Sequence, residues 1–266
     1  MQVTDQTGRL VVLSRPVRRI VSLVPSQTEL LAELNLEEQV VGITKFCVHP
    51  EKWFRTKTRV GGTKQVHPEL VRSLAPDLII ANKEENVKEQ VEALAAEFPV
   101  WVSDVNDLPS ALSMIRDIGL ITDREQPARQ IADRISTEFA KLVSFPPKKA
   151  AYLIWKEPYM VAGADTFIND MLTRAGFENV FASQNRYPAV SEEELLSSDA
   201  EVLLFSSEPY PFRPQHLDTF QRAGRICLLV DGELFSWYGS RLLQAPAYFS
   251  ILQQQISQAA NGVHGT

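Results

Sequence analysis

Aromatic side chains and a few polar groups gather in segments that directly follow predicted strands. Their flat faces, together with a guanidinium group, suit a large, ring-containing and partly anionic ligand better than a single ion. Packing of these rings beneath loops is the alternative for any one of them. We predict ligand binding by Ser26, Phe46, Trp155, Tyr159, Phe235, Trp237, Tyr238 and Arg241.

Two predicted helices begin soon after strands, at Ser26 and at Thr166. A helix N-terminus offers free N–H groups and a partial positive charge to an anionic substituent. The run from Ser26 to Glu29 also matches a capping box, with Ser26 as the N-cap residue. Anion binding and simple capping explain both helix starts equally well.

Signatures of common enzymes are missing from the sequence. It has no glycine-rich phosphate loop, no GxSxG turn and no HExxH motif. Cys47 and His49 could meet a metal ion, but no further ligands are spaced to complete a site. We therefore predict no catalytic residue, no metal site and no covalently required cofactor. An enzyme in the same fold stays open as an alternative, with the titratable candidates Glu157, Asp165, Asp231, Glu233 and Arg241.

Charge and hydropathy limit the partners. The 266 residues carry a formal net charge of −6, which argues against binding to nucleic acid or to an anionic membrane surface. No apolar run approaches the roughly 20 residues that a membrane span needs. We expect a monomer that binds a small molecule and does not itself cross a membrane.

The start of the sequence and its cysteines favour a cytoplasmic location. Residues 1–8 lack the basic stretch and apolar core of a signal peptide. Cys47 and Cys227 fall in different predicted lobes, and two unpaired thiols suit a reducing compartment. The alternative is a periplasmic or extracytoplasmic protein whose leader has been removed.

One pattern occurs twice in the chain. Residues 67–81 and 191–205 each read as a short helix, a turn and a buried strand. Glu69 falls on Glu193, and Asp77 falls on Glu201. A looser repeat relates the strand at residues 19–24 to the strand at 149–155. A chance match is the alternative, but the repeat favours two similar α/β lobes.

Strands alternate with helices in both halves, which predicts Rossmann-like lobes with mainly parallel sheets. We place the first lobe at residues 1–121 and the second at 146–266. An apolar stripe from Ala128 to Leu142 predicts one long helix over residues 122–145 that joins them. A surface helix within one lobe is the alternative. A cleft between two lobes is a usual place for a ligand.

Several segments together resemble a known family, the helical-backbone (class III) substrate-binding proteins of ABC importers. The pattern is most similar to those members that bind cobalamin or ferric siderophores. The resemblance covers most of residues 3–260. The segments that carry it are Arg19–Glu29, Val41–Thr44, Glu69–Ile80, Gly163–Phe167, Gly176–Phe181 and Val190–Glu193.

The resemblance implies capture of a corrinoid, haem-like or ferric-chelate ligand between the lobes, with limited lobe motion. It also implies that Glu69 and Glu193 dock into arginine pockets of an ABC permease dimer. Solvated helix-start glutamates are the alternative. The chain has Thr63 where the cobalamin binder has tryptophan, and Phe46 where it has tyrosine. A cytosolic protein or enzyme that handles corrinoids or metal chelates without a permease therefore stays open.

Overall fold

The computed structural model describes residues 1–143 and 145–263. The chain divides into two compact units, and each is described here by itself. Unit 1 comprises Met1–Val105, Pro109–Ser136 and Trp237–Arg241. Unit 2 comprises Asn106–Leu108, Thr137–Ser236 and the chain from Leu242 onward. The predicted lobe boundaries at residues 121 and 146, and ligand capture between lobes, stay predictions.

Unit 1 is built on a parallel sheet with the strand order β5-β4-β3-β6-β7. The chain winds outward from β3 to β5 on one side and from β6 to β7 on the other. The sheet therefore has a topological switch point between β3 and β6, where loops that leave the strands diverge. The strands are β3 (Ile20–Ser22), β4 (Val40–Ile43), β5 (Thr58–Arg59), β6 (Leu78–Asn82) and β7 (Val100–Ser103).

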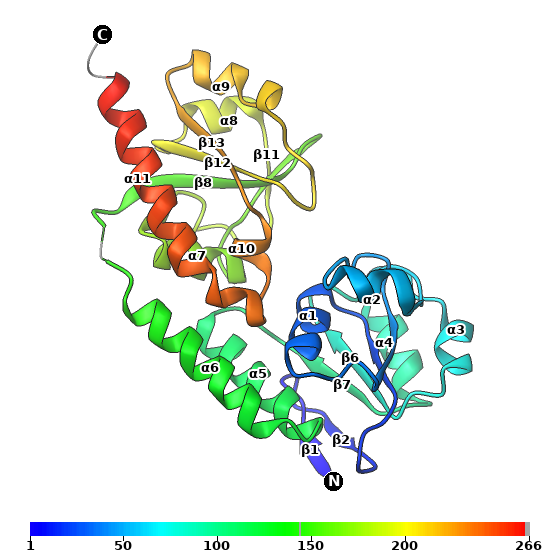
Figure 1. Cartoon of the computed structure of the whole chain (residues 1–266). Helices are drawn as coiled ribbons and strands as arrows, with labels where there is room; N and C mark the ends of the chain where they lie inside the picture. The colour runs from blue at the N-terminus through cyan, green and yellow to red at the C-terminus, as the bar shows by residue number, and fades with distance from the viewer. Residues whose placement is uncertain (144, 264–266) are drawn as a thin grey trace. The chain divides into compact units, whose positions relative to one another are not determined.

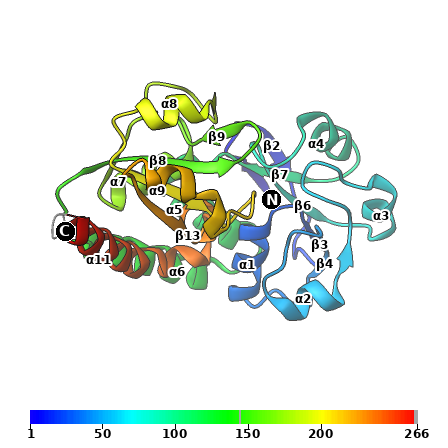
Figure 2. The ribbon, with the colours of Figure 1, turned by 90° about the horizontal axis from the view of Figure 1, so that it is seen from above.

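Helices cover both faces of this sheet. Figure 1 shows α1 and α5 on one side of β6 and α3 and α4 on the other, and Figure 2 shows the same separation of α1 from α3 and α4. Under α3 and α4, Val71, Val91 and Leu94 pack against Val21 and Ile79. The helices are α1 (Pro25–Glu33), α2 (Glu51–Thr56), α3 (Pro68–Ser73), α4 (Lys88–Ala95) and α5 (Leu108–Ile121).

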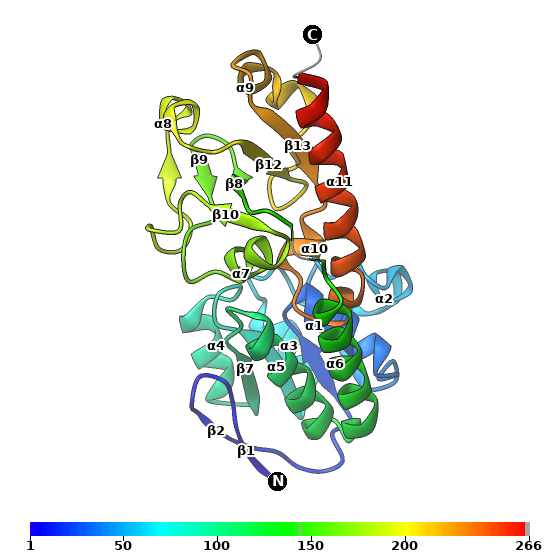
Figure 3. The same cartoon turned by 90° about the vertical axis from the view of Figure 1, so that its left-hand side faces the viewer.

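The chain begins with a small hairpin. Strands β1 (Gln2–Thr4) and β2 (Leu10–Val12) pair antiparallel, and Figure 3 shows them beside β7. The amide of Gln6 donates to the carbonyl of Val102 at 3.1 Å. The hairpin is thereby attached to the edge strand of the sheet.

The long predicted helix forms as α6 (Glu125–Ala140), which is shorter at both ends than residues 122–145. Before it, Asp123 adopts a left-handed φ of 56°, which ends α5 and makes a turn. The two helices cross closely, because a Cβ on Gly119 would lie 2.2 Å from that of Ala128. The role of α6 as a connector stays a prediction, and residue 144 lies outside the described residues.

Unit 2 has a sheet of the same type. In it β10, β8, β12 and β13 run parallel, while β9 and β11 add an antiparallel edge. The prediction of an α/β fold with mainly parallel sheets is confirmed. The strands are β8 (Lys148–Trp155), β9 (Tyr159–Val161), β10 (Phe177–Asn179), β11 (Ala189–Val190), β12 (Val202–Ser206) and β13 (Ile226–Val230).

In unit 2, α8 and α9 lie on one side of β8 and β12, and α7 and α10 lie on the other (Figure 1). Leu195 of α8 and Phe220 of α9 are buried in one cluster with Leu203 and Phe205 of β12. Within the described chain, no helix combines the length and the apolar character that a bilayer crossing requires. The helices are α7 (Phe167–Arg174), α8 (Glu192–Ser197), α9 (Asp218–Arg222), α10 (Glu233–Ser236) and α11 (Ala245–Val263), with short 3₁₀ turns at Pro214–His216 and Ser240–Leu243.

The internal repeat has a structural counterpart at its acidic positions. Before β6, the carboxylate of Asp77 accepts the backbone N–H groups of Arg18 and Arg19, each at 2.9 Å. Before β12, the carboxylate of Glu201 accepts the N–H of Lys149 at 3.0 Å. In each unit the acidic residue therefore fixes the start of the neighbouring central strand.

The predicted capping box at Ser26 was wrong. Helix α1 starts one residue earlier, with Pro25 in its first turn and Val24 as N-cap. Proline is well suited to this position because its missing N–H would have no partner there anyway. The predicted helix start at Thr166 is confirmed, since Thr166 is the N-cap residue of its helix and its hydroxyl accepts the N–H of Asn169 at 3.2 Å.

Candidate functional site

The loops that leave β3, β4 and β6 in unit 1 rest on a buried polar network at the switch point. The side-chain amide of Gln27 donates to the hydroxyl of Ser103, and that of Asn82 donates to the same hydroxyl at 3.0 Å. Next to them, the hydroxyls of Thr28 and Ser22 are 2.8 Å apart. Buried hydrogen bonds of this kind hold the carboxyl ends of β3, β6 and β7 and the start of α1 in one arrangement.

Phe46 is an exposed aromatic surface on the loop after β4. The residue is 51% exposed. A Cβ on Gly62 would lie 3.1 Å from the ring, so the ring rests directly on a bare backbone. The ammonium of Lys45 lies 5.1 Å from the ring centroid. A flat apolar ligand with an anionic group can meet the ring and the ammonium together.

In the Cys47–His49 pair, the thiol is engaged by two hydroxyl groups. The thiol of Cys47 lies 3.1 Å from the hydroxyl oxygens of Thr28 and Thr44 and is fully buried. Burial raises the pKa of this thiol to about 11, so it stays protonated at neutral pH. Among the residues that the structure describes, no three His, Cys, Asp or Glu side chains are grouped to hold a metal ion.

Trp237, Tyr238 and Arg241 belong to unit 1 and are mostly covered. Trp237 is 7% exposed and Tyr238 is 6% exposed. The hydroxyl of Tyr238 donates to the carboxylate of Glu85 at 2.5 Å. Burial, reinforced by the charge of Glu85, raises the pKa of Tyr238 well above its ordinary value, which keeps the donating proton in place. Arg241 pairs with Glu29.

Ser26 and Phe235 are also covered. Ser26 is 2% exposed, in the first turn of α1. Phe235 of α10 is fully buried in unit 2, where its ring centroid lies 5.0 Å from Tyr152 and 4.8 Å from Phe249. These positions suit support of the surrounding elements. The prediction that all eight residues contact ligand remains untested.

Unit 2 presents a second exposed aromatic surface, at the carboxyl end of β8. Trp155 is 40% exposed, and its ring centroid lies 5.6 Å from that of Tyr210. Tyr210 in turn lies 5.6 Å from the ring of His216. Sequence reasoning missed Tyr210 and His216, although Tyr210 follows β12 as the selected aromatic residues follow their strands.

Tyr159 lines a cavity of about 340 Å³ beside this aromatic surface. Burial, and next the charge of Glu192, raises the pKa of Tyr159. Burial and the nearby charge of Lys156 lower the pKa of His216, whose Nδ1 accepts the N–H of Arg213 at 3.0 Å. The cavity thus offers hydroxyl, imidazole, ammonium and carboxylate groups. Its walls are Lys156, Glu157, Pro158, Tyr159, Val190, Ser191, Glu192, Gln215, His216 and Thr219.

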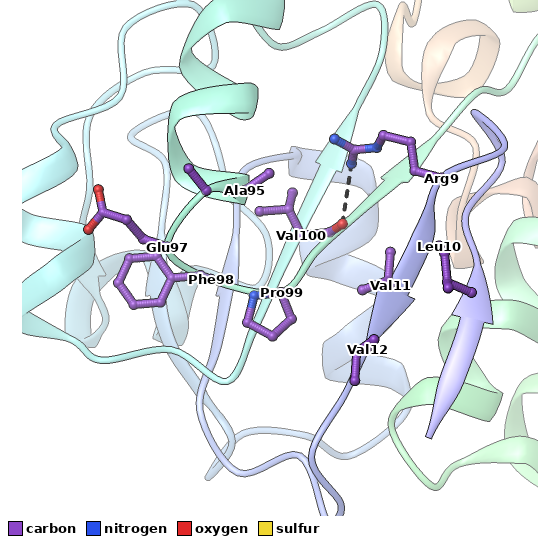
Figure 4. Close-up of a pocket in the computed structure, with 10 residues that line it drawn as sticks. Arg9, Leu10, Val11, Val12, Ala95, Glu97, Phe98, Pro99 and Val100 are labelled. Atoms are coloured by element: carbon purple, nitrogen blue, oxygen red, sulfur yellow. Dashed lines mark hydrogen bonds between the residues drawn. The ribbon is translucent and has the colours of Figure 1, made fainter.

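A cavity of about 380 Å³ in unit 1 lies away from these loops. Figure 4 shows it between β2 and the turn from α4 to β7, at the amino end of β7. The guanidinium of Arg9 donates to the carbonyl of Val100 at 3.2 Å, and the carboxylate of Glu97 turns away from the other lining residues. The switch-point loops leave the carboxyl ends of the strands, which is the opposite end of the sheet. This cavity therefore supports no ligand prediction.

The two glutamates of the repeat occupy the same place on their helices. Glu69 and Glu193 are each the second residue of a short helix, α3 or α8, and both are exposed. Glu69 pairs with Arg72 at 2.6 Å. Arg72 also pairs with Glu97 at 2.6 Å.

The titratable candidates for catalysis are mostly exposed. Glu157, Asp165 and Asp231 are exposed, and Arg241 is engaged by Glu29. Glu233 is half-buried, and its backbone N–H donates to the carboxylate of Asp231 at 3.1 Å.

Comparison with known proteins identifies relatives among solute-binding proteins. A family model described as "Periplasmic binding protein" matches residues 20–223. A Bacillus subtilis protein named as an uncharacterized ABC transporter substrate-binding lipoprotein is 26% identical over 76% of this chain and 68% of its own length. A vitamin B12-binding protein of Yersinia pestis is 24% identical over 73% of this chain and 71% of its own length.

Solved structures share the fold. The periplasmic vitamin B12-binding protein BtuF of Vibrio cholerae has a TM-score of 0.73 at 20% identity and covers 90% of this chain and 98% of its own. The periplasmic haem-binding protein RhuT of Roseiflexus sp. RS-1 has a TM-score of 0.73 at 21% identity, over 88% and 97% of the two chains. The molybdate-binding protein MolA of Haemophilus influenzae has a TM-score of 0.77 at 15% identity, over 97% and 93%.

The predicted cytoplasmic location was wrong. The matching family is described as periplasmic, and the relatives include a substrate-binding lipoprotein and periplasmic proteins. Cys47 and Cys227 are free thiols, but both are buried. Thiols that are shielded from solvent and from each other do not require a reducing compartment, so this signal did not bear on location.

Proposed function

Because the chain belongs to the periplasmic binding protein family, we propose that it is the substrate-binding component of an ABC importer. It captures a corrinoid, a haem-like molecule or a ferric chelate and catalyses no reaction. The relatives named for vitamin B12 and haem support ligands with a large flat ring system. Molybdate binding by a neighbour of the same fold shows that fold similarity alone does not select the ligand.

The observation that carries this proposal is the pair of exposed aromatic surfaces at the carboxyl ends of the two sheets. Phe46 in unit 1 and Trp155 in unit 2 are 51% and 40% exposed, which is unusual for rings of this size. Each is backed by other groups, Phe46 by Gly62 and Trp155 by Tyr210. A ring-containing ligand would replace water on such a surface.

Fluorescence titration with cyanocobalamin, cobinamide, haemin and a ferric hydroxamate tests the proposal. At least one of them should quench tryptophan emission saturably. An aromatic contact contributes about 1 kcal/mol, so Phe46→Ala and Trp155→Ala should each weaken binding about fivefold. The control is Phe98→Ala, which removes a half-buried ring at the amino end of the strands of the unit 1 sheet. It should leave affinity unchanged. Equal effects of all three changes would reject the two aromatic surfaces as the binding site.

For docking, we propose that Glu69 and Glu193 meet basic groups of a permease dimer. Both are exposed at equivalent positions of the repeated helix–strand unit, which suits a partner with two similar subunits. Exposed ion pairs contribute little by themselves. An ion pair that loses water at an interface contributes more, because removing the glutamate leaves the basic group of the permease buried without a counter-charge.

Replacing both glutamates by alanine should abolish ligand uptake by cells while the affinity for ligand in solution stays unchanged. The matched control changes Glu125 and Glu178, one exposed glutamate in each unit, and should leave uptake intact. Normal uptake by the Glu69→Ala/Glu193→Ala protein would exclude these residues as docking contacts.

A further inference from the structure

Residues Trp237–Arg241, here called the return segment, belong to unit 1 although both flanking stretches of chain belong to unit 2. The segment comes from the last quarter of the chain. It reaches three parts of unit 1 that are far apart in sequence, namely the start of α1, the loop after β4 and the loop after β6. Each of these parts leaves the carboxyl end of a strand near the switch point.

The contact with α1 is a bidentate ion pair. Arg241 Nη2 lies 2.5 Å from Glu29 Oε1, and its Nε lies 3.0 Å from Glu29 Oε2. The two side chains are only 13% and 17% exposed. Parallel hydrogen bonds between a guanidinium and a carboxylate fix direction as well as distance. The guanidinium also lies 4.9 Å from the ring centroid of Trp237.

The contact with the loop after β6 runs through Tyr238. Its hydroxyl donates to Glu85 at 2.5 Å. The backbone N–H of Glu85 in turn donates to the side-chain oxygen of Asn82 at 2.9 Å, at the end of β6. This loop is therefore held by its own strand on one side and by the return segment on the other.

Two further contacts depend on close packing. A Cβ on Gly239 would lie 2.7 Å from the carbonyl oxygen of Ser26, so this position admits only glycine unless the backbone moves. The ring of Trp237 lies edge-on to His49, with centroids 5.6 Å apart, and so reaches the loop that also carries Phe46.

We propose that the return segment is a brace that positions the ligand-facing loops of unit 1. Tyr238 and Arg241 are its positioning residues, and they act through Glu85 and Glu29 rather than by touching ligand. The low exposure of Trp237 and Tyr238 supports positioning in place of direct contact. The positioning role in ligand binding rests on the function proposed above, whereas the brace itself does not.

Hydrogen exchange of the full chain tests the brace without any ligand. The amides of residues 83–86 are all hydrogen-bonded, so their exchange is slow enough to follow. Tyr238→Phe removes one hydroxyl and should speed their exchange about fivefold, the effect of losing one hydrogen bond. The control is Tyr152→Phe, which removes a buried hydroxyl bonded to Ser206 at 3.1 Å in unit 2 and should leave these amides unchanged. Unchanged exchange in Tyr238→Phe would overturn the brace.

Ligand affinity then tests the positioning role, with cyanocobalamin and haemin as probes. Tyr238→Phe should weaken binding about fivefold, the effect of losing one hydrogen bond, and Gly239→Ala should also weaken it because the backbone must shift to admit a Cβ. Glu85→Gln keeps an oxygen acceptor for the Tyr238 hydroxyl and should bind nearly as well as the natural protein. Faster exchange with unchanged affinity would overturn the positioning role. If the natural protein binds neither probe, the proposed function fails for those ligands, and the exchange result still decides whether the brace exists.

Discussion

The ion pair between Arg241 and Glu29 allows a quantitative test of how the last quarter of the chain stabilises unit 1. Glu29→Gln preserves the shape of the side chain and removes its charge. Removing one member of a buried, hydrogen-bonded pair costs about 3–5 kcal/mol, because the other charge stays buried without compensation. Here the side chains are 13% and 17% exposed, and glutamine keeps one oxygen acceptor. We therefore expect a loss of about 2 kcal/mol, or about thirtyfold in the local unfolding equilibrium.

A matched pair elsewhere in unit 1 gives the control. Glu125 and Arg129 of α6 form an ion pair at 2.9 Å, but their side chains are 60% and 64% exposed. Glu125→Gln should therefore change stability by less than about 0.5 kcal/mol.

Native-state hydrogen exchange of the amides in α1, with increasing urea, reports unit 1 separately from unit 2. If Glu29→Gln and Glu125→Gln lower the free energy of local unfolding by equally small amounts, solvent screens the Arg241–Glu29 pair as well. That result would refute the reasoning from burial.

Two further predictions concern titration. The N–H of Ser191 donates to the carboxylate of Glu194 at 2.6 Å and lowers the pKa of that group. A lowered pKa gives stability that is present above the ordinary value of glutamate and is lost as pH falls through the lowered one, so Glu194→Gln should flatten the acid limb of unit 2 stability in urea unfolding between about pH 5 and 3. Burial raises the pKa of Cys47 to about 11 and that of Cys227 to about 12. Both thiols should react slowly with a disulfide reagent at neutral pH and rapidly in urea, and rapid reaction of the folded protein would contradict their burial.

Local sequence patterns predicted most of the fold. The repeated helix–turn–strand pattern identified α3 with β6 and α8 with β12, and its acidic positions bond to neighbouring strands through Asp77 and Glu201. The helices and turns depend on residues close in sequence, and both strands are continuous runs of buried residues, which a pattern records. The sequence pattern of a capping box occurs at Ser26 and at Ser191, but only Ser191 forms one. At Ser26 the preceding proline occupies the first helical turn, so the helix starts earlier.

The arrangement of the candidate site was less predictable, because it depends on contacts between residues far apart in the chain. Aromatic residues after strands were recognised as a class, but the pattern could not separate the exposed Phe46 and Trp155 from the covered Trp237 and Tyr238. Glu29 read as part of a capping box, whereas its carboxylate is engaged by Arg241. Neither residue's local sequence contains information about that partner.

Equilibrium dialysis of the purified chain against cyanocobalamin, cobinamide, haemin and a ferric hydroxamate tests the central claim most directly. The account predicts saturable binding of at least one of these molecules, with one ligand per chain. It also predicts that the stoichiometry persists in Glu69→Ala/Glu193→Ala and that affinity falls in Phe46→Ala/Trp155→Ala. Absence of saturable binding to every one of them, by a protein whose folding is confirmed by slow exchange in both sheets, would contradict it.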